Sequence, residues 1–440
     1  MLTAYDKMKI LFVSPIPLYK KRVKSAIQKL SDRFLFGFGK SLTFPILASL
    51  TPGKHQLEFI EGSHNQIDYS GKYDLVAITA VTKHALLAYE IADKFRKKGL
   101  TVVIGGWHAS ALPREVKQHA DSVVVGEAEL IWPQLLKDLE ENKLKSFYIS
   151  KNPVNPEDIP SPAIRILPKG AKTTVQATRG CPYNCEFCAI VNMKHRKKFR
   201  MRAIEKVIED IKSLPNKGFF FIDSSLTVNT EYTKELFRQM KPLNKKFYAY
   251  GNVDILGKDE ELLKLSSDAG CLTWYIGFES ISQNTVNSIG KTTNLVNDYI
   301  SSIKKIHDHG MIIMGSFIFG FDHDTKDVFY KTDEFIRKSR VDIPLLRILT
   351  PFPGTRLFNR LDLEGRIISR DWSKYDLDHV VFKPKNMAVE ELDIYVKKLR
   401  KKQYNLSNNV IRTARNIKFG PYIFLETAIM SKYLNSVTKK

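Results

Sequence analysis

Cysteine is scarce in this sequence, which has only four among its 440 residues. So few cysteines, with no secretory signal pattern near the start, argue against a disulfide-stabilised extracellular domain. Long apolar runs are also missing: the longest, Met311–Phe321, has the length of a buried strand and is too short to cross a bilayer. The run Ile10–Val13 is shorter than the apolar part of a signal peptide. We therefore expect a cytoplasmic protein with reduced thiols.

Acidic residues are sparse at both ends of the chain. Residues 1–40 hold nine Lys/Arg and two Asp/Glu, and residues 397–440 hold eleven Lys/Arg and a single acid, Glu426. The formal charge of +22 therefore belongs mainly to the ends, since the 356 residues between them carry only +5. A charge this positive is typical of nucleic-acid binding, but the near-neutral centre makes that function unlikely. The length and the 43% apolar composition are those of a globular protein with two or three domains.

Three of the four cysteines stand together as C-x-x-x-C-x-x-C, at Cys181, Cys185 and Cys188. The β-rich run 173–178 followed by Gly180 predicts a strand that ends in a loop carrying these thiols. Cys thiolates hold iron–sulfur clusters, usually four to a cluster, so three leave one iron open to a small chelating molecule. A structural zinc site needs four ligands, and Cys271 is distant and lies in an apolar run. We favour an open 4Fe–4S site over zinc or a disulfide, with Cys271 as a core thiol.

With the aromatic Phe187 before its last cysteine, this loop resembles that of the radical S-adenosylmethionine (SAM) superfamily. The resemblance implies that the open iron binds the amino and carboxylate groups of SAM. It also implies an external electron donor of the ferredoxin or flavodoxin type, whose electron leads to SAM cleavage and a hydrogen-abstracting deoxyadenosyl radical.

After the cysteine loop, short apolar runs alternate with helical patterns, which predicts about six β/α units, a partial barrel rather than an eight-unit one. The predicted strands are 218–223, 246–253, 272–279, 312–321 and 344–350. The predicted helices are 201–213, 230–241, 258–269, 294–309 and 327–338. Activity in such barrels lies at the carboxyl ends of the strands.

Residues at the carboxyl ends of the predicted barrel strands are candidates for contact with SAM. Gly277–Ser280 resembles the family's fourth-strand motif, which implies that Glu279 and Ser280 contact SAM; a barrel-rim salt bridge is the alternative for Glu279. The segment 315–320 resembles the fifth-strand motif, which places Gly315 and Gly320 beside the adenine. The ends of the second and third strands add two candidates for SAM or substrate contact, with structural roles as the alternative: Asp223 and Asn252.

The N-terminal part predicts a Rossmann-like, doubly wound parallel sheet. Its expected strands are 9–14, 56–61, 74–79, 101–104 and 122–125, with a helix over 83–98. In such sheets ligands bind outside the carboxyl ends of the strands. Glycines at those ends allow a flat or phosphate-bearing ligand to approach the backbone closely.

This part resembles the cobalamin-binding domain fused to one large branch of radical SAM enzymes. The match rests on Gly105-Gly-x-His108, Pro113-x-Glu115, Ala120-Asp121 and Gly126-Glu-x-Glu129. The D-x-H-x-x-G element that supplies an axial histidine in many cobalamin proteins is absent after the first strand. Two interpretations follow. Either cobalamin binds here without a histidine ligand from the protein, or the domain has lost the cofactor and retains only the fold. The resemblance implies six candidate cobalamin contacts: Thr79, Gly105, Gly106, His108, Gly126 and Glu127. For His108, a structural role is the alternative.

These patterns divide the chain into a Rossmann-like domain (1–140), a Pro-rich linker (141–172), a barrel (173–355) and a basic, mainly helical extension (356–440). Two segments combine basic and aromatic residues: a predicted amphipathic helix over 19–38, and the C-terminal part with its aromatic run 419–425. Such segments bind anionic membrane surfaces or partners, although an ordinary surface helix is the alternative for 19–38. The basic run 194–202 has two interpretations: it attracts an anionic substrate, or it is the solvent-exposed N-terminal end of a helix.

The sequence therefore predicts a radical SAM enzyme with a 4Fe–4S cluster, SAM and cobalamin. The favoured reaction is methylation of an unactivated carbon, with SAM as both methyl source and radical source. The alternative is a cobalamin-free carbon–carbon or ring-forming reaction. An RNA-modifying enzyme is a third possibility, disfavoured because the chain has no cysteine before Cys181 for the second cluster of the transfer-RNA methylthiotransferases. A lipid or other hydrophobic substrate is preferred over a soluble metabolite or peptide because the basic, aromatic ends suggest peripheral membrane contact.

Overall fold

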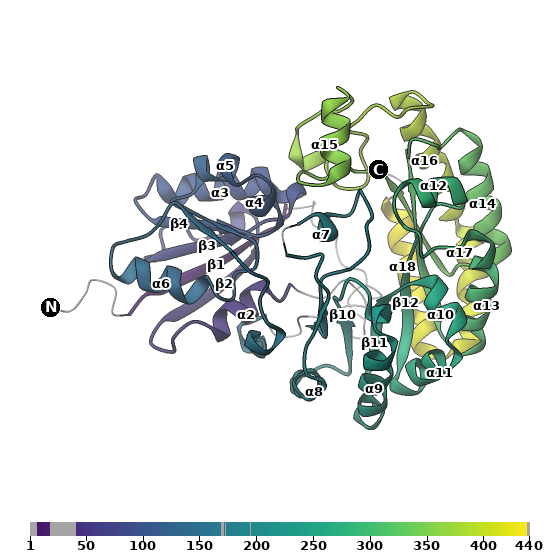
Figure 1. The fold of residues 1–440 in the computed structure, drawn as a ribbon, viewed down its shortest axis with the longest axis horizontal. Helices are drawn as coiled ribbons and strands as arrows, with labels where there is room; N and C mark the ends of the chain where they lie inside the picture. Colours follow the sequence, from purple (N-terminus) through teal and green to yellow (C-terminus); the bar gives the residue numbers. More distant parts are fainter. Residues whose placement is uncertain (1–6, 18–40, 169–170, 172, 194, 438–440) are drawn as a thin grey trace.

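The computed structural model describes residues 7–17, 41–168, 171, 173–193 and 195–437. The helix predicted over 19–38 lies outside these residues. The described chain forms two parallel α/β units side by side, with the C-terminal helices against the second (Figure 1).

The first unit contains a six-stranded parallel sheet in the order β2-β1-β3-β4-β5-β6. Five strands match the predicted ones closely: β1 Lys9–Pro15, β2 Gln56–Gly62, β3 Leu75–Thr79, β4 Thr101–Gly105 and β5 Ser122–Val125. The sixth, β6 (Phe147–Ile149), corrects the predicted boundary at residue 140, because the sheet continues into the segment expected to be linker. With three residues, β6 is too short for its pattern to be noticed.

Helices cover both faces of this sheet, as the doubly wound prediction requires. One face packs against α3 (Ala85–Arg96), α4 (Trp107–Ala111) and α5 (Pro113–Val116). The other packs against α2 (Thr43–Ser49) and α6 (Trp132–Glu140). The carboxyl ends of the strands point toward the second unit (Figure 1).

The second unit confirms the six-unit partial barrel. Its parallel sheet has the order β14-β13-β12-β11-β10-β7. The strands are β7 Thr174–Val175, β10 Gly218–Phe221, β11 Lys246–Gly251, β12 Cys271–Glu279, β13 Ile312–Phe319 and β14 Ile343–Ile348. The helices of this unit are α7 Ala189–Asn192, α8 Ile204–Ser213, α9 Thr230–Met240, α10 Val253–Lys258, α11 Glu260–Ala269, α12 Gln283–Ser288, α13 Tyr299–Asp308 and α14 Asp327–Ser339.

A short antiparallel ribbon holds the cysteine loop at the mouth of the barrel. Strand β8 (Thr178–Arg179) pairs with β9 (Arg200–Met201), so the segment between them leaves the barrel and returns to the same place. Cys271 lies at the start of β12, buried in the apolar core as expected.

The C-terminal part is mainly helical, as predicted, with α15 Arg356–Leu363, α16 Val389–Gln403, α17 Leu406–Arg415 and α18 Pro421–Val437. It belongs to the core of the barrel, because Val396, Leu399, Ile423 and Leu434 are buried in that cluster. The acidic residue of the last helix, Glu426, is also buried and accepts a hydrogen bond from Thr273 Oγ1 at 3.0 Å.

Glu426 predicts an unusual pH dependence of stability. Burial raises its pKa to about 8, from an ordinary value of 4.5, although hydrogen bonds from Thr273 and Tyr248 oppose the rise. A carboxyl with a raised folded-state pKa stabilises the fold fully below its unfolded pKa, and this advantage is lost as the pH rises toward 8. We expect Glu426→Gln to raise the Tm at pH 8 by about 3 °C or more, with little change at pH 4.5, in thermal unfolding followed by circular dichroism. The exposed Glu390→Gln is the control; an equal Tm change at both pH values would contradict the argument.

Candidate active site at the barrel mouth

The cysteine loop is clamped from three sides. Gly180 has a φ of +89°, and a Cβ there would lie 2.2 Å from the carbonyl oxygen of Lys198. On another side, Gly290 packs so closely that its Cβ would lie 2.4 Å from the Asn184 carbonyl oxygen. From within, the Asn192 amide donates to the carbonyl oxygens of Cys185 and Cys188 at 3.3 and 2.8 Å. The loop is therefore preorganised by its backbone.

Helix α15 fixes the outer side of the same loop. Arg360 pairs with Glu186 at 2.9 Å and with Asp322 at 2.6 Å. Arg356 donates through Nε to Asn192 Oδ1 at 3.2 Å. These contacts could not be predicted from local sequence patterns, because α15 lies more than 160 residues further along the chain.

The three predicted thiols come together at the barrel mouth. Cys185 is buried and the other two are half-buried. Burial raises the pKa of Cys181 to about 11 and that of Cys185 to about 12, and the thiols affect one another's ionisation. Burial also raises the pKa of Cys188. Three mutually close thiols on one clamped loop fit the donor set of a 4Fe–4S cluster with one open iron. Within the described ranges, no three His, Cys, Asp or Glu side chains form a site for a single metal ion.

Glu279 stands beside these thiols and is paired with a lysine. Its φ is +62°, a left-handed conformation uncommon for a non-glycine residue. Lys291 Nζ lies 2.6 Å from Glu279 Oε1 and donates to the Gly277 carbonyl oxygen at 2.6 Å. Burial opposes the charge on Lys291, but Glu279 and the cysteines raise its pKa above the ordinary value. The salt bridge that was the alternative role for Glu279 is thus present. The contact of Glu279 with SAM stays a prediction. Lys291 itself carried no motif that could have identified it.

The other predicted SAM residues fall into two groups. Asn252 has a buried Nδ2 with no hydrogen-bond partner among the described residues, and so does Asp254 Oδ1, two residues later. These two atoms lie on the carboxyl side of β11 and offer a donor and an acceptor to a polar ligand. Asp223 differs, because its carboxylate accepts hydrogen bonds from Ala177 N at 3.1 Å and Thr178 Oγ1 at 2.7 Å. Asp223 therefore holds the segment that leads into the cysteine loop, which is its structural alternative, and its contact with SAM or substrate stays a prediction.

The remaining candidates are backbone or packing positions. Phe187 packs edge-on against Phe321, with ring centroids 5.8 Å apart. Ser280 is buried at the end of β12. Gly315 lies within β13, where a Cβ would meet Phe278 at 2.9 Å, and Gly320 follows that strand with a φ of +106°. The contact of Gly315 and Gly320 with the adenine stays a prediction.

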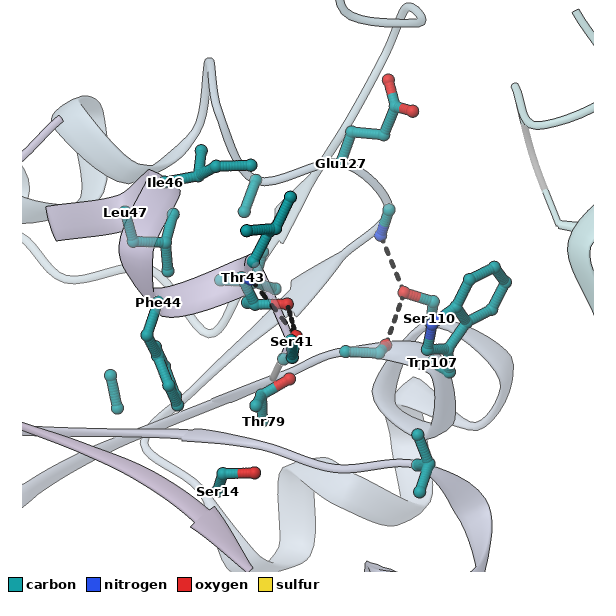
Figure 2. A pocket seen from close by; sticks show the side chains of 18 of the residues that line it. Ser14, Ser41, Thr43, Phe44, Ile46, Leu47, Thr79, Trp107, Ser110 and Glu127 are labelled. Carbon is teal, nitrogen blue, oxygen red and sulfur yellow. Dashed lines mark hydrogen bonds between the residues drawn. The ribbon is translucent and has the colours of Figure 1, made fainter. Parts of the chain in front are cut away.

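A cavity of about 490 Å³ lies at the strand ends of the first unit and opens toward the cysteine-bearing segment. Figure 2 shows Ser14 and Thr79 at the strand ends, with Phe44 and Leu47 of α2 forming an apolar wall. The second unit contributes to the same cavity through five residues: Gln176, Arg179, Met193, Arg196 and Ile222.

Five of the six predicted cobalamin contacts line this cavity: Thr79, Gly105, Gly106, Gly126 and Glu127. Gly106 has a φ of +99°, and a Cβ there would lie 2.7 Å from Thr79 Oγ1. Ser110 links the two glycine turns by donating to the Gly106 carbonyl oxygen and accepting from Gly126 N (Figure 2). A cavity with glycine-rich rims and an apolar wall fits a large flat cofactor.

His108 does not line the cavity, which corrects the expectation that it contacts cobalamin. It is buried, its Nε2 lies 2.8 Å from the Tyr89 hydroxyl and 3.5 Å from Glu115, and its ring packs edge-on against Trp372. Trp372 also donates to Glu115 at 2.7 Å. His108 therefore joins the first unit to the C-terminal part, the structural role given as its alternative.

Glu127 binds the two units together. Its carboxylate accepts two hydrogen bonds from Arg200, both at 2.8 Å, and lies 3.1 Å from Arg196 Nε. The neighbouring Glu129 pairs with Arg179 at 2.6 Å. Burial alone would raise the pKa of Glu127, but Arg200, Arg196 and Arg179 together lower it to about 2. Arg179 lies in β8, before the cysteine loop, and the other two arginines belong to the basic run 194–202. Part of that run is therefore neither solvated nor free for an anionic substrate.

Comparison with known proteins agrees with this geometry. The Radical SAM superfamily matches residues 175–336. The bacteriochlorophyllide d C-8(2)-methyltransferase of Chlorobaculum tepidum is 35% identical over 360 residues, covering 77% of this chain and 79% of the relative. The chain belongs to the radical SAM superfamily. It is an enzyme, and the cofactors of this superfamily are a 4Fe–4S cluster and SAM.

This radical SAM enzyme is also similar to a second methyltransferase and to a solved structure. The bacteriochlorophyllide d C-12(1)-methyltransferase of the same organism is 34% identical, covering 77% of this chain and 76% of the relative. The structure of TsrM from Kitasatospora setae, a radical SAM methyltransferase with cobalamin and a [4Fe–4S] cluster bound, has a TM-score of 0.69 at 12% identity. That similarity covers 98% of this chain and the whole of the other, so the complete two-unit fold is shared.

Proposed function

We propose that this radical SAM enzyme is a cobalamin-dependent methyltransferase that acts on an unactivated carbon of a hydrophobic ring compound. The observation that carries the proposal is the cavity at the Rossmann strand ends, whose walls include residues of the cysteine-bearing segment. Cobalamin held there would lie next to the site of radical formation. The methyl transfer named for the two bacteriochlorophyllide relatives supports this reaction over a cobalamin-free ring formation.

Different residues of the barrel mouth would bind the cluster and SAM. Cys181, Cys185 and Cys188 would hold the cluster, and the buried, unpartnered Asn252 Nδ2 and Asp254 Oδ1 would bind polar atoms of SAM. When bound, the cluster and SAM supply a hydrogen-abstracting radical and cobalamin supplies a methyl group. The packed loop and barrel mouth shield the site from water, and an external ferredoxin- or flavodoxin-type donor delivers the electron.

The lining of the barrel supports a hydrophobic ring as substrate. Tyr250 and Tyr275 lie on adjacent strands with ring centroids 4.6 Å apart, and Phe220 lies 5.3 Å from Tyr250. Each is partly exposed, although the barrel core around them is tightly packed. Aromatic side chains stack on flat apolar ligands, so a bacteriochlorophyllide-like ring fits this surface better than a charged soluble metabolite does.

An absorption spectrum tests the cofactor assignment. Purified protein is incubated with hydroxocobalamin, passed over a desalting column and measured against protein without cobalamin. We expect about one cobalamin retained per chain, because the cavity holds it between two units. Loss of all cobalamin on the column would remove methyl-cobalamin transfer and leave the cobalamin-free radical reaction.

We also propose that the C-terminal helices dock on an anionic membrane that contains the substrate. Four large apolar side chains of α17 and the turn after it are exposed: Leu406 (74%), Val410 (56%), Ile411 (59%) and Ile417 (64%). Exposed lysines flank them at Lys401, Lys402 and Lys418. An apolar stripe bordered by cations is typical of interfacial helices. Among the helices that the structure describes, none combines the length and apolar character of a membrane span.

Co-sedimentation with vesicles tests the docking. Removing residues after Leu399 would expose the barrel core, so substitutions on α17 are the better probe. We expect Leu406→Glu with Val410→Glu to weaken binding to phosphatidylglycerol vesicles by roughly 3 kcal/mol, from lost apolar burial and added negative charge. The matched control is Ile300→Glu with Tyr330→Glu, at exposed positions of α13 and α14. Equal binding of both double variants would refute a role for α17.

A further inference from the structure

We infer that His84 supplies an imidazole ligand to the cobalt of cobalamin on the side that faces the Rossmann unit. This inference rests on the proposed cobalamin-dependent function and adds a ligand to it. The chain lacks the D-x-H-x-x-G element after its first strand, and His84 lines the cavity from the turn that follows β3.

The position of His84 is fixed by two neighbouring strands. It ends the 3-10 turn Thr82–His84, which follows β3, and it lines the cavity. The ring hydrogen-bonds the backbone of Pro15, at the carboxyl end of β1. The turn itself packs against the segment Trp372–Lys374. The imidazole therefore lies beside the carboxyl end of β1, on a turn that packs against the C-terminal part.

The chemistry of the ring suits a metal ligand. A histidine ligand presents one nitrogen to the metal while the other donates to a carbonyl or carboxylate, and the contact with Pro15 can fill the second role. Among the described residues no other hydrogen-bond partner of the His84 ring is found. Burial and the neighbouring Lys83 lower the pKa of His84 to about 4, although the Pro15 contact opposes this. The ring is thus neutral near pH 7, the form that binds metals.

Competing ligands are few among the described cavity residues. His84 is the only imidazole that lines it, and the carboxylates of Glu127 and Glu129 are paired with arginines. Met193, the one thioether, comes from the cysteine-bearing segment and so approaches from the opposite side. Because the methyl group must face the barrel, the remaining axial position faces the Rossmann unit, from which His84 comes.

Electron paramagnetic resonance of bound cob(II)alamin tests this assignment. Protein grown on ¹⁵N medium is loaded with unlabelled cobalamin and reduced to the Co(II) state. Each cobalt line should split into a doublet, because the axial nitrogen comes from the ¹⁵N-labelled protein. His84→Gln should lose the doublet, whereas the exposed His379→Gln should keep it. Added ¹⁴N imidazole should give a triplet in the His84→Gln protein by occupying the vacated position.

The possible outcomes separate the inference from the proposed function. A triplet in the labelled wild-type protein would mean that cobalamin's own base is the ligand, and would overturn the inference. No nitrogen splitting, or a doublet that persists in His84→Gln, would overturn it as well. In each of these cases cobalamin is bound and the proposed function stands. A spectrum of free cobalamin, with none retained after desalting, would overturn both. If His84→Gln misfolds, a doublet in fully ¹⁵N-labelled wild-type protein that becomes a triplet when only the histidines carry ¹⁴N still identifies a histidine ligand.

Discussion

Cys185→Ala is expected to take up no stable 4Fe–4S cluster on anaerobic reconstitution and to lose SAM cleavage to below detection. Cys185 is the most buried of the three thiols, and its loop is fixed by Asn192 and by the close packing of Gly290. A cluster left with two protein thiolates has two open irons and no longer presents a single chelation site. Iron and sulfide counting, with 5′-deoxyadenosine measured by liquid chromatography, checks both losses.

Cys271→Ala is the matched control, because Cys271 is a buried thiol of the barrel core and lies outside the loop. It should keep full cluster content and SAM cleavage. Cluster uptake and SAM cleavage by Cys185→Ala at the level of this control would refute the ligand assignment.

Glu127→Ala is expected to lower the free energy of unfolding by about 3–5 kcal/mol, since it leaves buried arginines without a counter-charge. Arg200 and Arg179 are almost fully buried and come from the other unit, so their pairing with Glu127 and Glu129 also aligns the two units. Urea unfolding followed by fluorescence measures the loss. The control is Glu58→Ala, which removes an exposed pair with Lys9 and should cost less than about 1 kcal/mol.

The stabilisation of the fold by the Glu127 carboxylate should depend on pH. The folded-state pKa of Glu127, about 2, lies below its ordinary value of 4.5. The stabilisation is therefore complete above about pH 4.5 and is lost as the pH falls toward 2. The difference between wild type and Glu127→Ala should shrink over that range. A constant difference down to pH 3, or a loss no larger than that of Glu58→Ala, would argue against the ion-pair network.

Much of the fold could be predicted because its signals are local. Parallel strands buried on both faces give short apolar runs, and the five long barrel strands were each located to within three residues of their observed ends. The three cysteines are close in sequence, so their spacing together with the flanking strand and Phe187 predicts the donor set, which stays a prediction. The strand β6 was missed because three residues carry too little pattern.

The unpredicted parts of the site depend on contacts between distant segments. Lys291 reaches Glu279 from the loop after α12, and the arginines that hold Glu127 come from another unit. A carboxylate at a strand end looks the same in sequence whether it binds a cofactor, as expected for Glu127 and Asp223, or binds the protein itself. Only the three-dimensional placement of its partners distinguishes the two roles.

If cobalamin-dependent methyl transfer follows SAM cleavage at one barrel mouth, the origin of the new methyl group can be measured. Anaerobically reconstituted, cobalamin-loaded protein is reacted with a reductant, a hydrophobic ring compound and SAM that carries a deuterated methyl group. We expect a product with the deuterated methyl on carbon, together with both 5′-deoxyadenosine and S-adenosylhomocysteine, because SAM serves as radical source and methyl source. Formation of 5′-deoxyadenosine with a product that carries no label, and with no S-adenosylhomocysteine, would refute the proposed methyl transfer.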